Sequence, residues 1–301
     1  MVSKVFLANA AAAAASLSAG ASIVATRLVI GESDAGTLAF YRYIIGVACL
    51  APALYLLWPR DGLALREVGK IAALGALFFG LFPWAFNASL GYIPAARGAI
   101  GLATIPIQTL IIAVLAGRET LSVGKLLSVS LAFAGVAVAF GPAAFEADPR
   151  YLAGDALMLL GALSAAIYAV FGRPTLARHD PLFVTALAMI FGVLALLPLA
   201  AANGAVDSLP GFSTDGWLAL LFLGTVGGAL QFSLFAWALR WLLPSRTAIY
   251  LALNPLSAML LAVLILDESL TVALIAGLIL ALSGIFVANL PKRQPARPAP
   301  R

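Results

Sequence analysis

The residues of this chain that could contact a small ligand are neutral polar and aromatic side chains set inside long apolar runs. Two of these runs, residues 95–116 and 245–266, carry such positions at helical spacing, so that they share one face of each predicted helix. They are Gly101, Ile105 and Gln108 in the first run and Tyr250, Asn254 and Ser257 in the second. Amides, hydroxyls and aromatic rings predict a cavity with an apolar wall and a few uncharged hydrogen-bonding groups.

Other apolar runs offer side chains of the same kind. The further candidates for the wall of this cavity are Ser16, Gly20, Trp84, Asn87, Ser164, Tyr168, Gln231, Phe235 and Trp237. For each of them a second interpretation stays open, because hydroxyls and amides also join helices inside membranes and aromatic residues also gather at membrane surfaces. As a set, they favour a small amphipathic zwitterion over a phosphate or a sugar acid.

Charged residues avoid the centres of the apolar runs, since no Asp, Glu, Lys or His lies near the middle of any of them. Proton-driven pumps commonly use intramembrane carboxylates as relays, so this pattern argues against tight proton coupling. Arg42 lies inside a run, and it could either snorkel outward or neutralise a substrate carboxylate. Glu119 and Glu268 follow the two runs that carry Gln108 and Asn254. We favour a structural role for these two glutamates, at the start of a nearby helix, over a role in proton coupling.

Catalytic, metal and cofactor chemistry find no support in the sequence. His179 is the only histidine, and we expect it to be a solvated loop residue beside Asp180. The glycine-rich stretches at residues 75–80 and 224–228 carry no lysine, so they predict close helix crossings or a hinge rather than phosphate loops. We therefore expect no cofactor, no metal and no enzymatic activity.

Composition places these residues in a membrane. Hydrophobic residues make up 63% of the 301 and charged residues only 10%, whereas a soluble domain carries about 25% charged residues. A bilayer-spanning helix needs about 20 apolar residues. Ten such spans are predicted, at residues 5–29, 36–58, 69–91, 95–116, 122–141, 153–172, 181–202, 215–241, 245–266 and 271–290.

The distribution of basic residues predicts that both termini are cytoplasmic. With that orientation fourteen of the eighteen Lys and Arg residues fall on the inner side, and the exceptions are Arg27, Arg42, Arg97 and Arg150. The basic, proline-rich tail at residues 291–301 fits a disordered cytoplasmic end near anionic lipid. The net charge of +5 largely reflects this asymmetry, so it does not indicate nucleic-acid binding.

The chain repeats itself in two halves, residues 1–148 and 149–290. A shift of 149 aligns residues 97–139 with 246–288 at 17 identities in 43 positions, including the pairs Arg97 and Arg246 and Glu119 and Glu268. A shift of 146 aligns residues 17–27 with 163–173. Each half holds five spans, and because five is odd the second half enters the membrane inverted, as in many secondary transporters. The first span has an interior counterpart, so we interpret it as part of the fold and not as a signal peptide.

The repeat also pairs two prolines inside spans, Pro106 and Pro255. Proline has no amide hydrogen, so each frees a carbonyl four residues earlier, at Leu102 and Leu251. We predict a kink at both places, facing a cavity where other groups can satisfy the carbonyl. A bend that merely shapes packing is an equally open interpretation.

These features resemble the drug/metabolite transporter superfamily, in particular its EamA-type repeats. The resemblance covers about residues 5–290 and rests on the five-span repeat, the starts of the fourth and ninth spans, the stretches "AGRETLS" and "LDESLT", and the glycine-marked spans that follow. It implies an all-α integral membrane protein of ten transmembrane helices, built as two inverted five-helix repeats around a central cavity. Within the superfamily, the chain looks most like the bacterial exporters of aromatic amino acids.

We therefore expect a secondary transporter of the bacterial inner membrane that exports small amphipathic metabolites, chiefly aromatic and other neutral amino acids. Alternating access without a coupling ion is the favoured mechanism. The alternatives are a proton-coupled multidrug or organic cation exporter of the same fold, and a non-transporting membrane scaffold. The expected partners are the small-molecule substrate and the bilayer. The fifth and tenth spans could face either lipid or a second copy of the chain in a homodimer.

Overall fold

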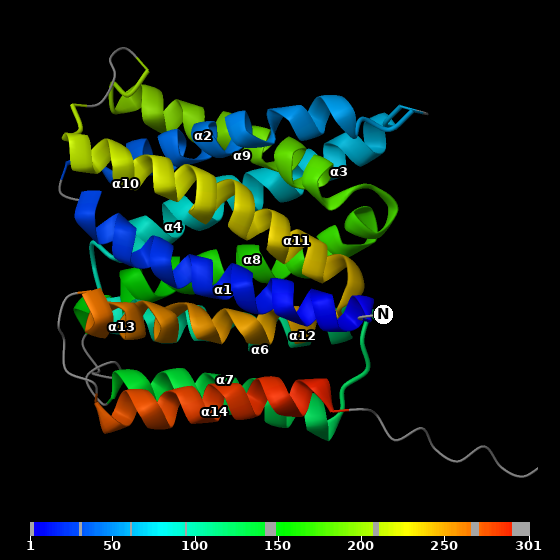
Figure 1. Cartoon of the computed structure of the whole chain (residues 1–301), viewed down its shortest axis with the longest axis vertical. Coiled ribbons are helices and arrows are strands. Elements are labelled where there is room, and N and C mark those ends of the chain that lie inside the picture. Colours follow the sequence, from blue (N-terminus) through cyan, green and yellow to red (C-terminus); the bar gives the residue numbers. More distant parts are fainter. Residues whose placement is uncertain are drawn as a thin grey trace, which may run out of the picture.

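The computed structural model describes residues 3–29, 32–60, 62–93, 95–141, 149–206, 211–265 and 271–290. Within these ranges every regular element is a helix, and the long helices lie side by side along one common direction (Figure 1). The expected all-helical membrane fold is confirmed. Glu268 and the tail at 291–301 lie outside the described residues.

In its described residues the first half contains seven α-helices and one π-helical segment. They are α1 (Lys4–Val29), α2 (Ala35–Leu56), α3 (Leu65–Gly75), η1 (Ala76–Leu81), α4 (Phe82–Ser89), α5 (Ala95–Ala103), α6 (Ile105–Leu115) and α7 (Val123–Phe140). The second half repeats this order, with short 3-10 segments added. It contains η3 (Pro149–Tyr151), α8 (Leu152–Arg178), α9 (Pro181–Ala202), α10 (Thr214–Gly224), η4 (Thr225–Leu230), α11 (Gln231–Trp241), α12 (Pro244–Ile249), η5 (Tyr250–Ala252), α13 (Leu253–Ile265) and α14 (Val272–Asn289).

Nine helical stretches of the described residues are long and apolar enough to cross a bilayer. The remaining predicted span, the ninth, corresponds to residues 244–265, where α12, η5 and α13 follow one another as an interrupted helix. The boundaries agree with expectation to within a few residues, except that α8 continues to Arg178 instead of ending at residue 172.

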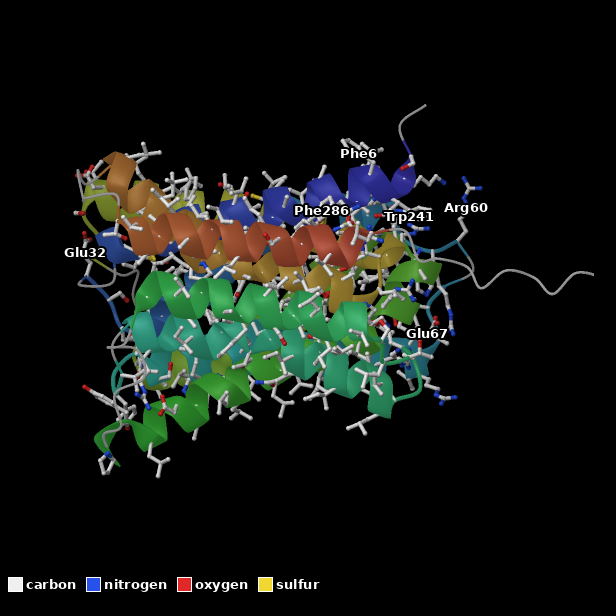
Figure 2. All side chains as sticks on the ribbon, turned by 90° about the horizontal axis from the view of Figure 1, so that it is seen from below. Phe6, Glu32, Arg60, Glu67, Trp241 and Phe286 are labelled. Atoms are coloured by element: carbon white, nitrogen blue, oxygen red, sulfur yellow. The ribbon has the colours of Figure 1, made fainter. Side chains whose placement is uncertain are left out.

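Two ends of the bundle can be told apart. The start of α1 and the end of α14 lie at the same end (Figure 1), and Phe6, Arg60, Glu67 and Trp241 mark that end in Figure 2, whereas Glu32 lies at the other. We call the first end the terminal face and the second the opposite face.

The helix starts follow the repeat. Asp34 and Asp180, which the shift of 146 aligns, are the N-caps of α2 and α9, and Ser122 and Thr271, which the shift of 149 aligns, are the N-caps of α7 and α14. Each of these four side chains accepts a hydrogen bond from a backbone amide of the first turn, which satisfies a donor that the helix leaves free. The same local chemistry therefore starts the same helix in both halves.

Spans 3 and 8 each contain a π-helical turn at repeat-related positions. The segment η1 begins directly after Gly75 and η4 directly after Gly224. The amide of Phe82 bonds the carbonyl of Leu77, five residues back, in place of the α-helical partner four residues back. Such π turns are uncommon and often lie at functional sites. The glycine-rich stretches therefore form a widened turn at mid-span.

Helices α1 and α8 occupy equivalent places in the two halves. Helix α1 packs against α10, α11 and α13, and α8 packs against the counterparts α3, α4 and α6. The close approaches repeat as well: a Cβ on Gly75 would lie 2.2 Å from the carbonyl oxygen of Ala188, and a Cβ on Gly224 would lie 3.0 Å from that of Arg42. This packing makes α1 and α8 the central helices of an inverted repeat.

Helices α7 and α14 pair with each other at one edge of the bundle (Figure 1). Their backbones touch through small residues, because a Cβ on Gly135 would lie 2.6 Å from the Gly277 carbonyl oxygen. Small residues allow this close packing in membranes. Their outer faces carry exposed side chains such as Leu127 and Phe286. A homodimer through these spans stays a prediction.

Candidate functional site

An aromatic cluster fills the region between α2, α8 and the two π turns. Phe78 of η1 stacks on Tyr168 of α8 at 4.3 Å between ring centroids, and Phe79 meets Phe232 of α11 edge-on at 5.0 Å. Tyr43 of α2 adds a further edge-on contact with Phe79 at 5.5 Å. The rings come from four of the ten spans and from both halves, so motion of one half against the other must rearrange this cluster.

A small cavity lies beside the cluster. Its walls are formed by Ile71, Leu74, Tyr168, Gly172, Thr175, Val184 and Ala188, and its volume of about 10 Å³ has room for about one water molecule. Of the residues predicted to line a cavity, only Tyr168 contributes to this one.

Several predicted residues meet where α1 crosses α13. Gly20 lies against Ser257 and Asn254, since a Cβ at Gly20 would lie 1.9 Å from Ser257 Oγ and 2.9 Å from the Asn254 carbonyl oxygen. The Oδ1 atom of Asn254 is buried and has no hydrogen-bond partner among the described residues. One turn before Gly20, the buried Oγ of Ser16 is equally unpartnered there. Buried polar atoms are nearly always paired, so these two mark a place where a ligand or water can bind.

Gln108 lies just beyond the break in the fourth span. Its Nε2 donates to Thr104 Oγ1 at 3.0 Å, whereas its Oε1 is buried without a partner in the described part of the chain. Thr104 separates α5 from α6, and its own hydroxyl donates to the Gly101 carbonyl at 2.6 Å. Pro106 is the second residue of α6. Pro255 is the third residue of α13, the helix that begins directly after η5. Both spans are therefore interrupted just before their proline.

The remaining predicted residues are distributed over several environments. Gln231 accepts a hydrogen bond from Ser22 Oγ at 3.5 Å, Phe235 is buried next to Phe78, and Tyr250 accepts one from Asn289 at 3.1 Å. Trp237 packs against an apolar cluster of α1, α11 and η5, and Trp84 is 39% exposed on α4. Ser164 is bonded to the carbonyl of Leu160 in its own helix. Asn87 is half-buried on α4.

Arg42 does not snorkel outward. Its Nη2 donates to the carbonyl of Gly227 in η4 at 2.6 Å, so the guanidinium points across the bundle toward the second half. The side chain is partly buried, and its Nε is buried without a partner among the described residues. Of the two interpretations that the sequence left open, the outward one is wrong.

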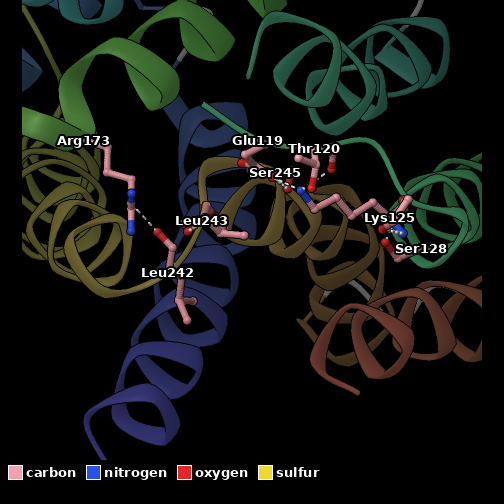
Figure 3. Close-up of polar contacts among 10 residues, drawn as sticks. Glu119, Thr120, Lys125, Ser128, Arg173, Leu242, Leu243 and Ser245 are labelled. Carbon is pink, nitrogen blue, oxygen red and sulfur yellow. Dashed lines mark hydrogen bonds and ion pairs between the residues drawn. The ribbon is translucent and has the colours of Figure 1, made fainter. Parts of the chain in front are cut away.

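Glu119 joins the two halves at the terminal face, as Figure 3 shows. It accepts hydrogen bonds from the backbone amide and the Oγ of Ser245, at 3.1 and 2.6 Å, and forms an ion pair with Lys125 Nζ at 2.7 Å. The carboxylate side chain is fully buried. Because Ser245 lies in the first turn of α12, Glu119 also faces the positive end of that helix dipole.

A second contact between the halves at this face involves His179. Its Nε2 lies 3.2 Å from Glu67 Oε2, and Arg178 pairs with the other Glu67 oxygen at 3.1 Å. The His179 side chain is only 16% exposed. His179 lies in the loop between α8 and α9, as expected, but it is paired with Glu67 instead of being solvated, because α8 runs further than predicted and brings it to the start of α3.

The opposite face also joins the halves through polar contacts. Glu32 accepts from the amide and the Oγ of Ser213 at 2.7 and 2.8 Å, and Asn203 Nδ2 donates to Asp34 at 2.8 Å. Burial raises the pKa of Asp34, but hydrogen bonds from Thr37, Asn203 and the first turn of α2 outweigh it and leave the pKa below its ordinary value. This carboxylate therefore stabilises the fold above its ordinary pKa, and the stabilisation is lost as the pH falls through the lowered value.

An ion pair strengthens the same face. Arg97 at the start of the fourth span forms a bidentate pair with Asp155 of α8, with a closest approach of 2.6 Å. Both faces are thus held by contacts between the halves in this conformation.

The family follows from a match to both halves of the chain. The EamA-like transporter family matches residues 6–141 and again residues 152–290. The chain belongs to the EamA-like transporter family. It is therefore a multi-pass helical membrane transporter, and the two matches coincide with the repeat.

Several relatives of this EamA-like transporter are similar over most of their length. An uncharacterized transporter of Archaeoglobus fulgidus is 26% identical over 278 residues, which cover 91% of this chain and 94% of the relative. The uncharacterized transporter YoaV of Bacillus subtilis is 24% identical over 260 residues, covering 86% and 89%. A solved crystal structure has a TM-score of 0.78 and 21% identity over 94% of this chain and 96% of its own, a likeness of fold.

Chemically, the candidate residues offer aromatic faces, neutral oxygens without a partner among the described residues, and one cation. Sequence reasoning identified the neutral oxygens of Gln108 and Asn254 but missed Phe78, Phe79 and Ser22. The two phenylalanines could have been found, because they follow Gly75 in the stretch that the repeat aligns with Gly224.

Proposed function

We propose that this EamA-like transporter exports small zwitterionic metabolites, chiefly aromatic and other neutral amino acids, by alternating access without proton coupling. In a bacterial inner membrane the terminal face would be the cytoplasmic one, as the distribution of basic residues predicts.

The observation that carries this proposal is the pair of interrupted helices with unpartnered oxygens. Gln108 Oε1 and Asn254 Oδ1 follow the breaks of spans 4 and 9, and both are buried. Interrupted helices near mid-membrane are where secondary transporters commonly bind substrates. Neutral oxygens that lack donors suit an ammonium group, because they can accept its hydrogen bonds without a buried counter-charge.

The aromatic cluster could contact the apolar part of the proposed substrate. The Phe78, Phe79 and Tyr168 rings lie in the same layer of the bundle as the π turns and offer faces and edges to an aromatic side chain. A π turn can also shift back to α-helical pairing, which changes the direction of the following residues. The cluster can therefore open without unfolding a span.

Several carboxylates of the described residues have structural partners, which supports the absence of proton coupling. Glu119 is paired with Lys125, Asp155 with Arg97, and Glu67 with Arg178. Each lies toward an end of the bundle and not at its middle. No described mid-span carboxylate is thus available as a proton relay.

The test is to replace the two unpartnered oxygens. In liposomes, Gln108→Ala and Asn254→Ala should each reduce phenylalanine counterflow about tenfold, the effect of losing one hydrogen bond of ordinary strength to the substrate. Size-exclusion profiles and melting temperatures should stay close to those of the wild type, because neither oxygen has a partner among the described residues and Gln108→Ala removes only one further bond, from Nε2 to the nearby Thr104 hydroxyl. Ser130→Ala, on the exposed face of α7, is the control.

Normal counterflow in both variants would show that the oxygens do not contact the substrate. Wild-type vesicles that carry an organic cation in exchange for protons, but no amino acid, would assign the chain to the multidrug exporters instead.

A further inference from the structure

Arg42 is a charged residue inside a membrane-spanning helix that has no carboxylate partner among the described residues. It is the eighth residue of α2, which places it about 10 Å below the opposite face at 1.5 Å per residue. Ionisable residues at such depth are rare and normally paired, or they serve as counter-ions for a ligand. The neighbouring Tyr43 ring, 5.7 Å from the guanidinium carbon, provides no compensating negative charge.

The π turn η4 holds this guanidinium in a fixed place. The Gln231 amide, which would bond the Gly227 carbonyl in an α-helix, bonds the carbonyls of Val226 and Gly228 instead. The Gly227 carbonyl accepts from Arg42 Nη2 at 2.6 Å, and this uses one of the five guanidinium N–H groups. Arg42 Nε is buried without a protein partner, so an N–H group remains for an oxygen that the described protein does not supply.

The surroundings of Arg42 are polar and closely fitted. A Cβ on Gly227 would lie 2.2 Å from Ser22 Oγ and 3.1 Å from Arg42 Nη2, so glycine alone leaves this space free. Ser22 Oγ in turn lies 3.5 Å from Gln231 Oε1. A cation, a hydroxyl and an amide from three helices therefore surround one glycine.

The internal repeat shows that the fold does not require an arginine here. The shifts of 146 and 149 align Arg42 with Ala188, Ser22 with Tyr168, Gly227 with Phe78 and Gln231 with Phe82. In the repeat-related packing, the carbonyl of Ala188 lies against Gly75 in the same way as the carbonyl of Arg42 lies against Gly224. The π turn η1 forms there without any guanidinium. The helix packing around Arg42 is therefore polar and cationic, whereas its repeat-related copy around Ala188 is aromatic.

We propose that Arg42 is the specificity-determining counter-ion for the carboxylate of the transported substrate, with Ser22 and Gln231 as its polar neighbours. This inference rests on the proposed function and narrows it to substrates that carry a carboxylate. A guanidinium suits this group because it offers paired N–H donors that match the two carboxylate oxygens.

The experiment compares phenylalanine with phenylalaninamide, which lacks the negative charge, in liposomes with wild-type protein, Arg42→Gln and Arg42→Lys. We expect Arg42→Gln to raise the KM for phenylalanine at least tenfold and to leave phenylalaninamide flux unchanged. Arg42→Lys keeps the charge but not the paired donors, so its KM for phenylalanine should fall between those of the wild type and Arg42→Gln. Arg60→Gln, an exposed arginine at the terminal face, is the matched control and should change neither substrate.

An unchanged KM in Arg42→Gln, or an equal loss of both substrates in a variant that folds, would overturn the proposal in favour of a structural role for Arg42. A second readout covers the case in which wild-type protein moves no amino acid and the proposed function fails. Phenylalanine, benzoate and lactate are then tested for their effect on the melting temperature of wild type and of Arg42→Gln. A rise with any of these carboxylates that is lost in the variant supports the proposal, and no rise with any of them refutes it.

Discussion

Glu119→Ala is expected to destabilise the protein by about 3–5 kcal/mol, the usual cost of removing one partner of a buried ion pair. The Glu119 side chain is fully buried, and its loss removes the acceptor of both Ser245 donors and the ion-pair partner of Lys125 Nζ, which keeps its bond to the Thr120 carbonyl. Thermal unfolding in detergent should show this as a large drop in melting temperature. The terminal face should also close less firmly, because this contact joins the connection between α6 and α7 to the start of α12.

Glu67→Ala is the matched control for this prediction. Glu67 also joins the halves at the terminal face, but its partner Arg178 is 69% exposed, and an exposed pair contributes only about 0–1 kcal/mol. Equal melting temperatures for the two variants would contradict the structural role assigned to Glu119. Ser245→Ala should remove only the hydroxyl bond and should therefore cost less than Glu119→Ala.

Gly75→Ala is the second change with a large expected effect. A Cβ at this position would lie 2.2 Å from the carbonyl oxygen of Ala188, which is backbone and cannot rotate away. Overpacking of this kind costs about 1–3 kcal/mol, and it should also separate α3 from α9 just before the π turn η1. We expect a lower melting temperature together with loss of transport, because the aromatic cluster depends on this crossing.

The same helix supplies the control. Gly69 has nothing within 4 Å of its would-be Cβ, so Gly69→Ala should leave transport unchanged and should slightly stabilise α3 through the higher helix propensity of alanine. If Gly75→Ala behaved like Gly69→Ala, the close crossing of α3 and α9 would not be essential to the fold.

Much of the fold was predictable because local chemistry repeats. Asp34 and Asp180 start equivalent helices, and the interruptions before Pro106 and Pro255 follow from the missing amide hydrogen of proline. The repeat then fixed the inverted order of the spans. The short lengths of polar sequence between spans made their boundaries accurate to within a few residues.

The contacts of the site could not be predicted in the same way, because they depend on which helices cross and at what height. The pairing of Arg42 with Gly227 needs a π turn, and periodicity in a glycine-rich stretch does not distinguish π from α pairing. Glu119 was expected to contact the start of a nearby helix, but its partner Ser245 is 126 residues away in the other half. His179 reached Glu67 only because α8 continued past the predicted end.

We propose that this EamA-like transporter moves amino acids down their own gradient. The most direct measurement is the uptake of labelled phenylalanine into liposomes that contain the purified protein, with and without an imposed pH gradient. We expect internal phenylalanine to rise to the external concentration without the gradient, and we expect the gradient not to raise this plateau. Accumulation above the external concentration that requires the gradient would contradict it, because a carboxylate assigned here to structure would then carry protons.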